Sequence, residues 1–124
     1  MIRGTGVDIV SFQRMADILG RSGSAFLRRT FTEGELLFLS AHRDPTALCA
    51  ALFAGKEAVF KTFGSGWERG GSFRDIEIDR LEGGLPHVAL RGIFAEMMKE
   101  DGSLSLTVRL SSCATAALAM AIRG

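Results

Sequence analysis

The spacing of apolar residues changes several times along this chain, and each change predicts a switch between strand and helix. Residues 2–10 (IRGTGVDIV) favour a strand because of their β-branched side chains, and strand alternation places Asp8 on the opposite face from Val7 and Ile9. Further on, apolar residues three and four positions apart predict helices. The predicted helices cover residues 11–20, 33–41, 45–63 and 91–101, and the further strands cover residues 73–79, 87–90, 103–110 and 114–122.

Capping residues mark the helix boundaries. Ser11 is a typical N-cap for the first helix, and residues 32–35 (TEGE) fit a capping box for the second. Asp44 can cap the third helix, with Pro45 at its first position, where proline is best tolerated. The predicted stops of the first and third helices are Gly20 and Gly64.

Turn residues predict that the strands are joined in hairpins. Glu82-Gly83-Gly84 is typical of a tight turn between the strands at 73–79 and 87–90, and a short connection joins the last two strands. The chain has neither an internal repeat nor a linker-like segment, so residues 1–124 are expected to form a single domain. The expected fold class is α+β, with an antiparallel sheet packed on one long helix.

Composition and charge narrow the classes of function. The formal net charge of +1 argues against extensive nucleic-acid binding, and the longest apolar run, residues 114–122, is too short to cross a bilayer. Two cysteines make neither a disulfide framework nor a zinc site, and early charged residues interrupt any secretory signal, so we expect a cytoplasmic protein. Residues 1–30 carry five arginines and two aspartates, which fits an acidic partner or simply a solvated helix.

The stretch ALFAGKEAVFK at residues 51–61 places charges in an otherwise apolar helix. Glu57 and Lys61 are four residues apart and share a face with Phe53. An exposed pair of this kind contributes only about 0.2–0.5 kcal/mol to helix stability. Gly55 in the middle of the helix costs about 1 kcal/mol relative to alanine, so it is expected to have a packing reason.

A second carboxylate makes this helix a candidate metal site. Asp8 at the end of the first strand and Glu57 can together hold one magnesium ion, with substrate phosphates and waters completing the coordination. Lys61, one turn after Glu57, could meet the same phosphates. The glycine-rich loop after the helix offers further backbone N–H groups for a phosphate, at Gly64, Ser65 and Gly66.

Two of these segments resemble the paired signatures of the 4′-phosphopantetheinyl transferases. They are residues 6–9 (GVDI) and residues 53–61 (FAGKEAVFK). The small size, the GSG sequence and the FRDIEI strand resemble the holo-acyl-carrier-protein synthase branch of that family. Residues 29–35 (RTFTEGE) and 84–86 (GLP) also match family segments, so the resemblance extends over nearly the whole chain.

The resemblance implies an enzyme that moves the phosphopantetheine arm of coenzyme A onto a serine of an apo acyl carrier protein and releases 3′,5′-ADP. Asp8 and Glu57 match the magnesium ligands, and Lys61 matches the lysine that neutralises the pyrophosphate. The family usually assembles as a homotrimer with each active site at a subunit interface. The remaining matches on the coenzyme A side are Lys56, Pro86 and Ser111.

The carrier protein of such an enzyme is acidic, and the resemblance implies that the first helix contacts it. Arg14 and Arg21 are seven residues apart, which places them on roughly the same helix face. Solvated charges at these two positions fit the sequence equally well.

The sequence departs from the family at the coenzyme A end. Ser112 stands where a histidine is expected, and Leu85 replaces a basic residue in the Gly-x-Pro turn. Arg109 is a candidate for the missing cationic contact. The alternatives to an active transferase are a carrier-binding homologue without catalysis and a metal-dependent hydrolase of nucleotide pyrophosphates.

Overall fold

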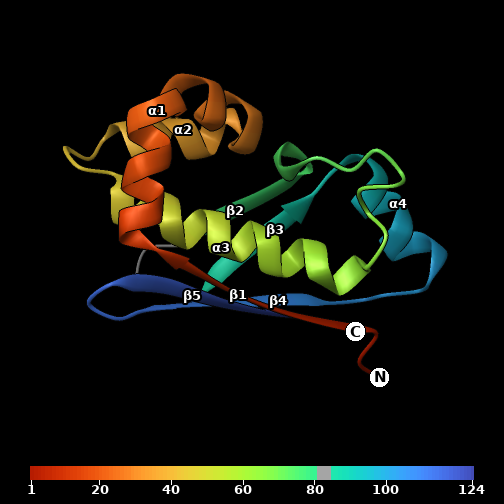
Figure 1. The fold of residues 1–124 in the computed structure, drawn as a ribbon. Helices are drawn as coiled ribbons and strands as arrows, with labels where there is room; N and C mark the ends of the chain where they lie inside the picture. The colour runs from red at the N-terminus through yellow and green to blue at the C-terminus, as the bar shows by residue number, and fades with distance from the viewer. Residues whose placement is uncertain (81–84) are drawn as a thin grey trace.

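A computed structural model describes residues 1–80 and 85–124, and Figure 1 shows helices layered on a curved sheet. The predicted turn at residues 82–84 lies outside the described residues. The strands are β1 (Gly4–Ser11), β2 (Ile76–Arg80), β3 (Pro86–Leu90), β4 (Leu106–Ser112) and β5 (Ala116–Arg123). The helices are α1 (Phe12–Thr30), α2 (Glu33–Ser40), α3 (Thr46–Phe63) and α4 (Gly92–Glu100), with a short 3-10 helix η1 (Phe73–Asp75) before β2.

The strands form two antiparallel sheets. One has the order β1-β5-β4, and the other pairs β2 with β3. In the larger sheet, Val7 of β1 lies opposite Met120 of β5, which lies opposite Arg109 of β4. The two termini lie side by side at one end of this sheet, where the amide of Arg3 donates to the carbonyl of Arg123 at 2.7 Å (Figure 1). The expected α+β fold class is confirmed.

Helix α3 is the centre of the molecule. It packs on β1, β4 and β5 on one side and on α1 and β2 on others, so most of its residues are buried. The contact with β1 is close because β1 carries glycines there. A Cβ on Gly6 would lie 2.0 Å from the carbonyl oxygen of Ala58, and one on Gly4 would lie 2.0 Å from that of Thr62. The described structure also explains Gly55, since a Cβ there would lie 2.6 Å from Ile78 Cδ1.

Helix α1 is longer than predicted. The chain stays helical past Gly20 to Thr30, with a kink at Ser22, whose φ and ψ of −145° and 35° are not helical. The predicted stop at Gly20 is therefore wrong. The second segment is held by packing, because the Phe26 ring makes edge-on contact with Phe53 of α3 at 5.4 Å between centroids.

Two other boundary predictions are also wrong. Helix α3 begins at Thr46 rather than at Pro45, so the N-cap residue is Pro45 and not the predicted Asp44, whose carboxylate accepts from the Thr46 amide at 3.1 Å just before the helix. Residues 73–75 form η1 instead of the first part of a strand, because the Asp75 carboxylate accepts from the backbone of Ser72 and closes a tight turn. The N-cap at Ser11 and the capping box between Thr32 and Glu35 are confirmed.

Candidate active site

The site is built where the edge strand β1 crosses α3. Alternation along β1 turns Asp8 towards α3, on the side of the buried Val10, while Val7 and Ile9 point away from the helix and are each 63% exposed. The predicted placement of Asp8 opposite Val7 and Ile9 is confirmed. The close approach at Gly6, two residues earlier, brings the Asp8 carboxylate within reach of α3.

Lys61, near the C-terminal end of α3, contributes an ammonium group to the site. Its ammonium group donates to the carbonyl of Val7 at 2.8 Å and lies 3.3 Å from Asp8 Oδ1. The Lys61 side chain remains half exposed, so part of the ammonium is free to meet a ligand. Two residues far apart in sequence thus form a mixed-charge pair at the edge of the sheet.

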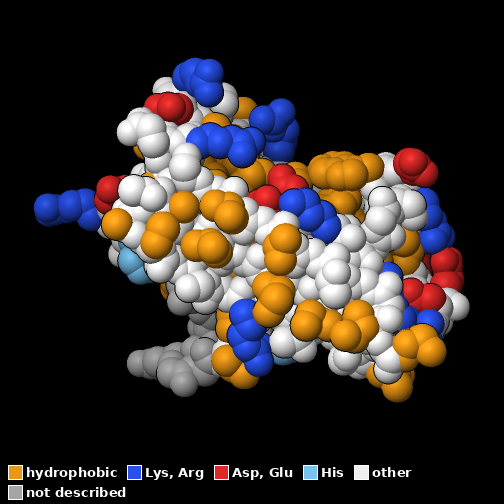
Figure 2. Space-filling model, turned by 60° about the horizontal axis from the view of Figure 1, so that its bottom comes forward, with side chains coloured by type: hydrophobic (Ala, Val, Ile, Leu, Met, Phe, Trp, Pro, Cys, Tyr) orange, Lys and Arg blue, Asp and Glu red, His pale blue; other side chains and the backbone are white. Residues whose placement is uncertain are grey.

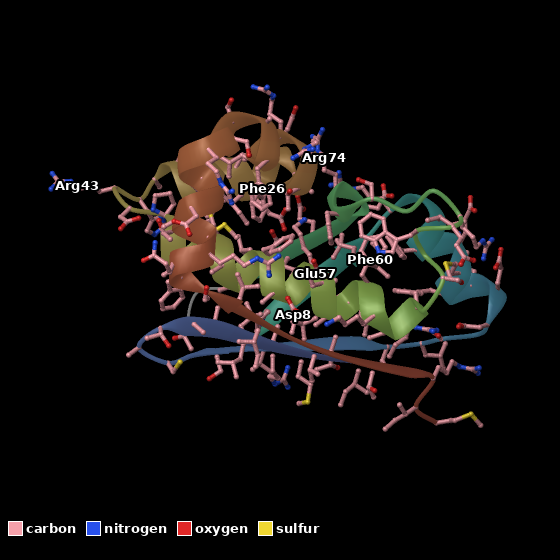
Figure 3. The ribbon with its side chains drawn as sticks, in the orientation of Figure 1. Asp8, Phe26, Arg43, Glu57, Phe60 and Arg74 are labelled. Atoms are coloured by element: carbon pink, nitrogen blue, oxygen red, sulfur yellow. The ribbon has the colours of Figure 1, made fainter. Side chains whose placement is uncertain are left out.

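Glu57 lies one turn before Lys61 and is half buried. Burial raises the pKa of its carboxyl, and the negative charge of Asp8 raises this pKa further, while Lys61 and Arg14 oppose the shift. The Asp8 and Glu57 carboxylates are therefore close enough to repel each other. Figure 3 shows these two residues coming from β1 and α3 on the same side of the molecule.

This pair of carboxylates fits a magnesium ion. A divalent cation relieves the repulsion that raises the Glu57 pKa, and magnesium is commonly held by one or two carboxylates together with substrate phosphates. Among the described residues no group of three or more acidic, histidine or cysteine side chains is placed to hold a metal. Phosphates and waters would have to complete the coordination of an ion held by Asp8 and Glu57.

A hollow of about 660 Å³ opens from this site across the outer face of the larger sheet. Asp8 and Lys61 line it at the β1 edge, and Arg109 and Ser111 line it from β4. Ser111 and Arg109 share this face, whereas alternation turns Ser112 to the other face of β4. The apolar part of the lining consists of Val7, Ile9, Leu118, Ala119 and Met120.

The structure places Lys56 away from this hollow. Its side chain is fully buried, and its ammonium group lies 2.6 Å from Glu35 Oε1. Burial lowers the pKa of Lys56, although the charge of Glu35 opposes this shift. Lys56 therefore does not join the group formed by Asp8, Glu57 and Lys61.

Unlike Ser111, the predicted coenzyme A contacts at residues 64–66 and at Pro86 are not among the described residues that line the hollow. Gly64, Ser65 and Gly66 follow the C-terminus of α3, where the helix dipole disfavours an anion, and the Ser65 amide already donates to the carbonyl of Phe63 at 2.8 Å. Pro86 begins β3 and is not among the described residues that line the hollow.

The two arginines of α1 differ in their relation to the site. Arg14 is close enough to Glu57 to lower the pKa of that carboxyl. Arg21 is exposed one turn beyond Asp17 and donates to the Asp17 carbonyl at 3.4 Å. Both guanidinium groups remain available to a partner.

Sequence reasoning missed two features. The buried partner of Lys56 is Glu35, which the sequence marked only as part of a helix cap. The exposed outer face of the sheet was also missed, although strict alternation of Val7, Ile9 and Asp8 already indicated that two apolar side chains point away from the helix.

Comparison with known proteins identifies the class. The family model for the 4′-phosphopantetheinyl transferase superfamily matches residues 4–121, so the chain belongs to this family of enzymes. It is 36% identical to the holo-[acyl-carrier-protein] synthase of Solibacter usitatus, over 98% of this chain and 95% of that protein. It is 40% identical to the holo-[acyl-carrier-protein] synthase of Desulforudis audaxviator, over 98% of this chain and 92% of that protein.

A solved structure agrees with these relatives. The Helicobacter pylori holo-[acyl-carrier-protein] synthase in complex with coenzyme A superimposes with a TM-score of 0.82 at 29% identity, covering 97% of this chain and 99% of that chain. The chain is thus a phosphopantetheinyl transferase similar to holo-acyl-carrier-protein synthases. In the described residues, no helix has the length and apolarity needed to cross a membrane.

Proposed function

We propose that this enzyme transfers the 4′-phosphopantetheine arm of coenzyme A to a serine of an acidic acyl carrier protein and releases 3′,5′-ADP, with magnesium as the metal. The observation that carries the proposal is the meeting of Asp8 and Lys61 at 3.3 Å beside the half-buried Glu57. The relatives named holo-[acyl-carrier-protein] synthase and the coenzyme A complex of one of them support the same reaction.

The reaction moves a phosphoryl-linked group between two oxygens. The serine hydroxyl attacks the β-phosphorus of coenzyme A, the bond from that phosphorus to the bridging oxygen breaks, and 3′,5′-ADP leaves with the electron pair. The serine proton passes to a carboxylate or to water. Charge develops on the pyrophosphate oxygens, so catalysis depends chiefly on positioning and on electrostatic stabilisation.

Different residues of this chain would bind the metal, the phosphates and the nucleotide. Asp8 and Glu57 would hold the metal, which supplies charge neutralisation at the phosphates when it is bound. Lys61 is held by the Val7 carbonyl and presents its ammonium to the same phosphates. Ser111 and Arg109 line the opposite side of the hollow, where they can meet the nucleotide.

The proposal includes an acidic carrier docking on α1. Arg14 and Arg21 are exposed on this helix, and Arg14 lies near Glu57, so a carrier held there would present its serine to the carboxylate site. Charge complementarity of this kind chiefly raises the association rate and makes it dependent on salt. A cytoplasmic location belongs to the proposal as well, since Cys49 and Cys113 are both free thiols.

A homotrimer is the assembly that we propose. The outer face of the larger sheet exposes apolar side chains that include Val7, Ile9 and Met120, and Figure 2 shows hydrophobic side chains gathered on this side with basic groups among them. Such a patch is typical of an interface between subunits. Packing of this face on a neighbouring copy would place the hollow between subunits. Light scattering or native mass spectrometry measures the assembly directly.

The transfer itself is tested by intact-protein mass spectrometry. An apo acyl carrier protein is incubated with this enzyme, coenzyme A and magnesium, and a parallel sample contains EDTA. We expect the carrier to gain one phosphopantetheine only when magnesium is free. No gain on several folded carriers, together with binding of those carriers, would instead support a carrier-binding homologue without catalysis. Loss of coenzyme A without a carrier would indicate the hydrolase.

A further inference from the structure

Lys56 is a fully buried lysine that the proposed reaction does not use. Its ammonium group lies 2.6 Å from Glu35 Oε1 and donates to the carbonyl of Phe73 at 2.9 Å and to that of Ile76. It also lies 5.6 Å from the centroid of the Phe31 ring. All three hydrogen-bond donors of the ammonium are therefore occupied by protein groups.

Both carboxylate oxygens of Glu35 also accept hydrogen bonds from the protein. One of its carboxylate oxygens accepts from the Thr32 amide at 2.9 Å, and the other accepts from the Ile78 amide at 2.8 Å. The Lys56–Glu35 pair thus joins α3 to α2 and to the segment from η1 into β2. A buried pair of charges is costly to break, because removal of one partner leaves the other charge unpaired away from water.

Lys56 directly precedes the candidate metal ligand Glu57 in sequence, but its side chain points elsewhere, to Glu35 in the core. Successive residues on an α-helix are about 100° apart around the axis, so with Lys56 anchored in the core, Glu57 points to the side where Asp8 lies. A rotation of α3 by about 20° would move a side-chain tip that is about 8 Å from the axis by roughly 3 Å. Metal ligands tolerate only about 0.2 Å of variation in their distances.

We propose that Lys56 and Glu35 act as a positioning pair. The pair fixes the rotation of α3 about its axis and so keeps the Glu57 carboxylate facing Asp8, where the two can bind one divalent cation. This inference rests on the proposed function, because it concerns the same metal site. It also assigns Lys56 a role different from contact with the coenzyme A phosphates. Such a contact would require the ammonium to leave Glu35 and two backbone carbonyls inside the core.

The test is Lys56→Met, which keeps an unbranched apolar side chain in the same space. Binding of Mn²⁺ is measured by EPR in the presence of coenzyme A and the absence of carrier, at a temperature where the variant is folded. We expect the Mn²⁺ dissociation constant to rise about tenfold, as is typical when the support of a metal ligand is lost. In transfer assays at saturating metal, we expect KM for coenzyme A to change less than twofold.

The opposite pattern would overturn the inference. If Lys56 contacts the coenzyme A phosphates, Lys56→Met raises KM for coenzyme A and leaves Mn²⁺ binding unchanged. If the pair is merely structural, the melting temperature falls while both constants stay at the wild-type values. The wild type is measured first. If it neither binds Mn²⁺ nor transfers phosphopantetheine, the proposed function itself is overturned.

A second variant guards against a failure of Lys56→Met to fold. Glu35→Gln weakens the same pair from α2, retains one acceptor oxygen and leaves Lys56 bonded to its two carbonyls. We expect a smaller rise in the Mn²⁺ dissociation constant, about threefold, in the same direction. Leu39→Ala, in the same helix, is the matched control, because it removes buried carbon without removing a charge and should lower the melting temperature alone.

Discussion

The ammonium of Lys61 lies 3.3 Å from a carboxylate oxygen of Asp8, although 53 residues separate the two in the chain. The contact exists because α3 lies directly against β1. It places a positive charge beside a pair of carboxylates at the β1 edge of the hollow, so the ammonium and a cation held by the carboxylates could meet the same phosphorylated ligand.

Replacing Lys61 should lower the transfer activity without lowering the stability of the fold. Lys61→Met should lower kcat/KM for phosphopantetheine transfer by about 10²–10³, which is the usual loss when one electrostatic group at a developing charge is removed. The melting temperature should change little, because the pair with Asp8 is partly exposed. Lys99→Met, on α4, is the control and should retain full activity. A Lys61 variant with wild-type kcat/KM would remove this residue from the mechanism.

Glu57 makes the stability of the metal-free enzyme depend on pH. Its raised pKa means that the folded state binds a proton more readily than the unfolded state. The associated stability is fully present below the ordinary pKa of about 4.5 and is lost as the pH rises through the folded pKa. In EDTA, Glu57→Gln should therefore melt at a higher temperature than the wild type at pH 7, and the difference should shrink towards pH 4.

Magnesium provides the control for this measurement. Adding it at pH 7 should raise the melting temperature of the wild type and leave that of Glu57→Gln nearly unchanged, because only the wild type retains both carboxylates. A variant that melts below the wild type in EDTA at pH 7 would contradict the assignment of an unfavourable carboxylate pair.

Gly6 permits the contact between β1 and α3 on which the site depends. Gly6→Ala places a Cβ 2.0 Å from the carbonyl oxygen of Ala58, so the strand must move away from the helix and carry Asp8 with it. We expect a loss of about 1–3 kcal/mol in the free energy of unfolding and a higher magnesium requirement for transfer. Denaturant titration and magnesium titration measure the two effects.

Gly20→Ala is the matched control for this substitution. Gly20 lies in α1 with nothing within 4 Å of the added Cβ, and alanine favours a helix more than glycine does. This variant should be as stable as the wild type or more so. Equal losses in the two variants would show that the close approach of β1 and α3 has no special importance.

Arg109 is expected to contribute to the use of coenzyme A. It and Lys61 are the basic residues among the described lining of the hollow, and it donates only to its neighbouring Val108 carbonyl among the described residues. Arg109→Ser should raise KM for coenzyme A several-fold, while KM for 3′-dephospho-coenzyme A should change less. The control is Arg43→Ser, since Figure 3 shows Arg43 projecting far from Asp8 and Glu57. Equal effects on the two substrates would exclude a contact with the 3′-phosphate.

The sequence was sufficient to predict those features that depend on residues close together in the chain. The caps at Ser11 and Thr32 and the alternation around Asp8 follow from side chains within a few residues of each other, and the structure agrees with them. The course of α1 past Gly20 was not predictable in this way. The Phe26–Phe53 contact that holds its second segment joins residues from different helices.

The same distinction applies to the candidate site. The spacing of Glu57 and Lys61 predicted a shared helix face, and that is what brings both of them to Asp8. Lys56 could not be placed from spacing, because an exposed lysine and a buried one have the same sequence pattern. Its burial depends on Glu35, which lies on another helix and offers the compensating charge.

The neighbouring chain ends have a practical consequence for handling the protein. Arg3 and Arg123 are bonded through their backbones, so a tag on either terminus would emerge from the same corner of the larger sheet. Figure 1 shows this corner at the far end of the sheet from α1. Fluorophores or surface anchors attached there would leave α1, which carries Arg14 and Arg21, accessible to a carrier. A short peptide joining the two ends would give a cyclised enzyme in which the backbone pairing of β1 with β5 is kept.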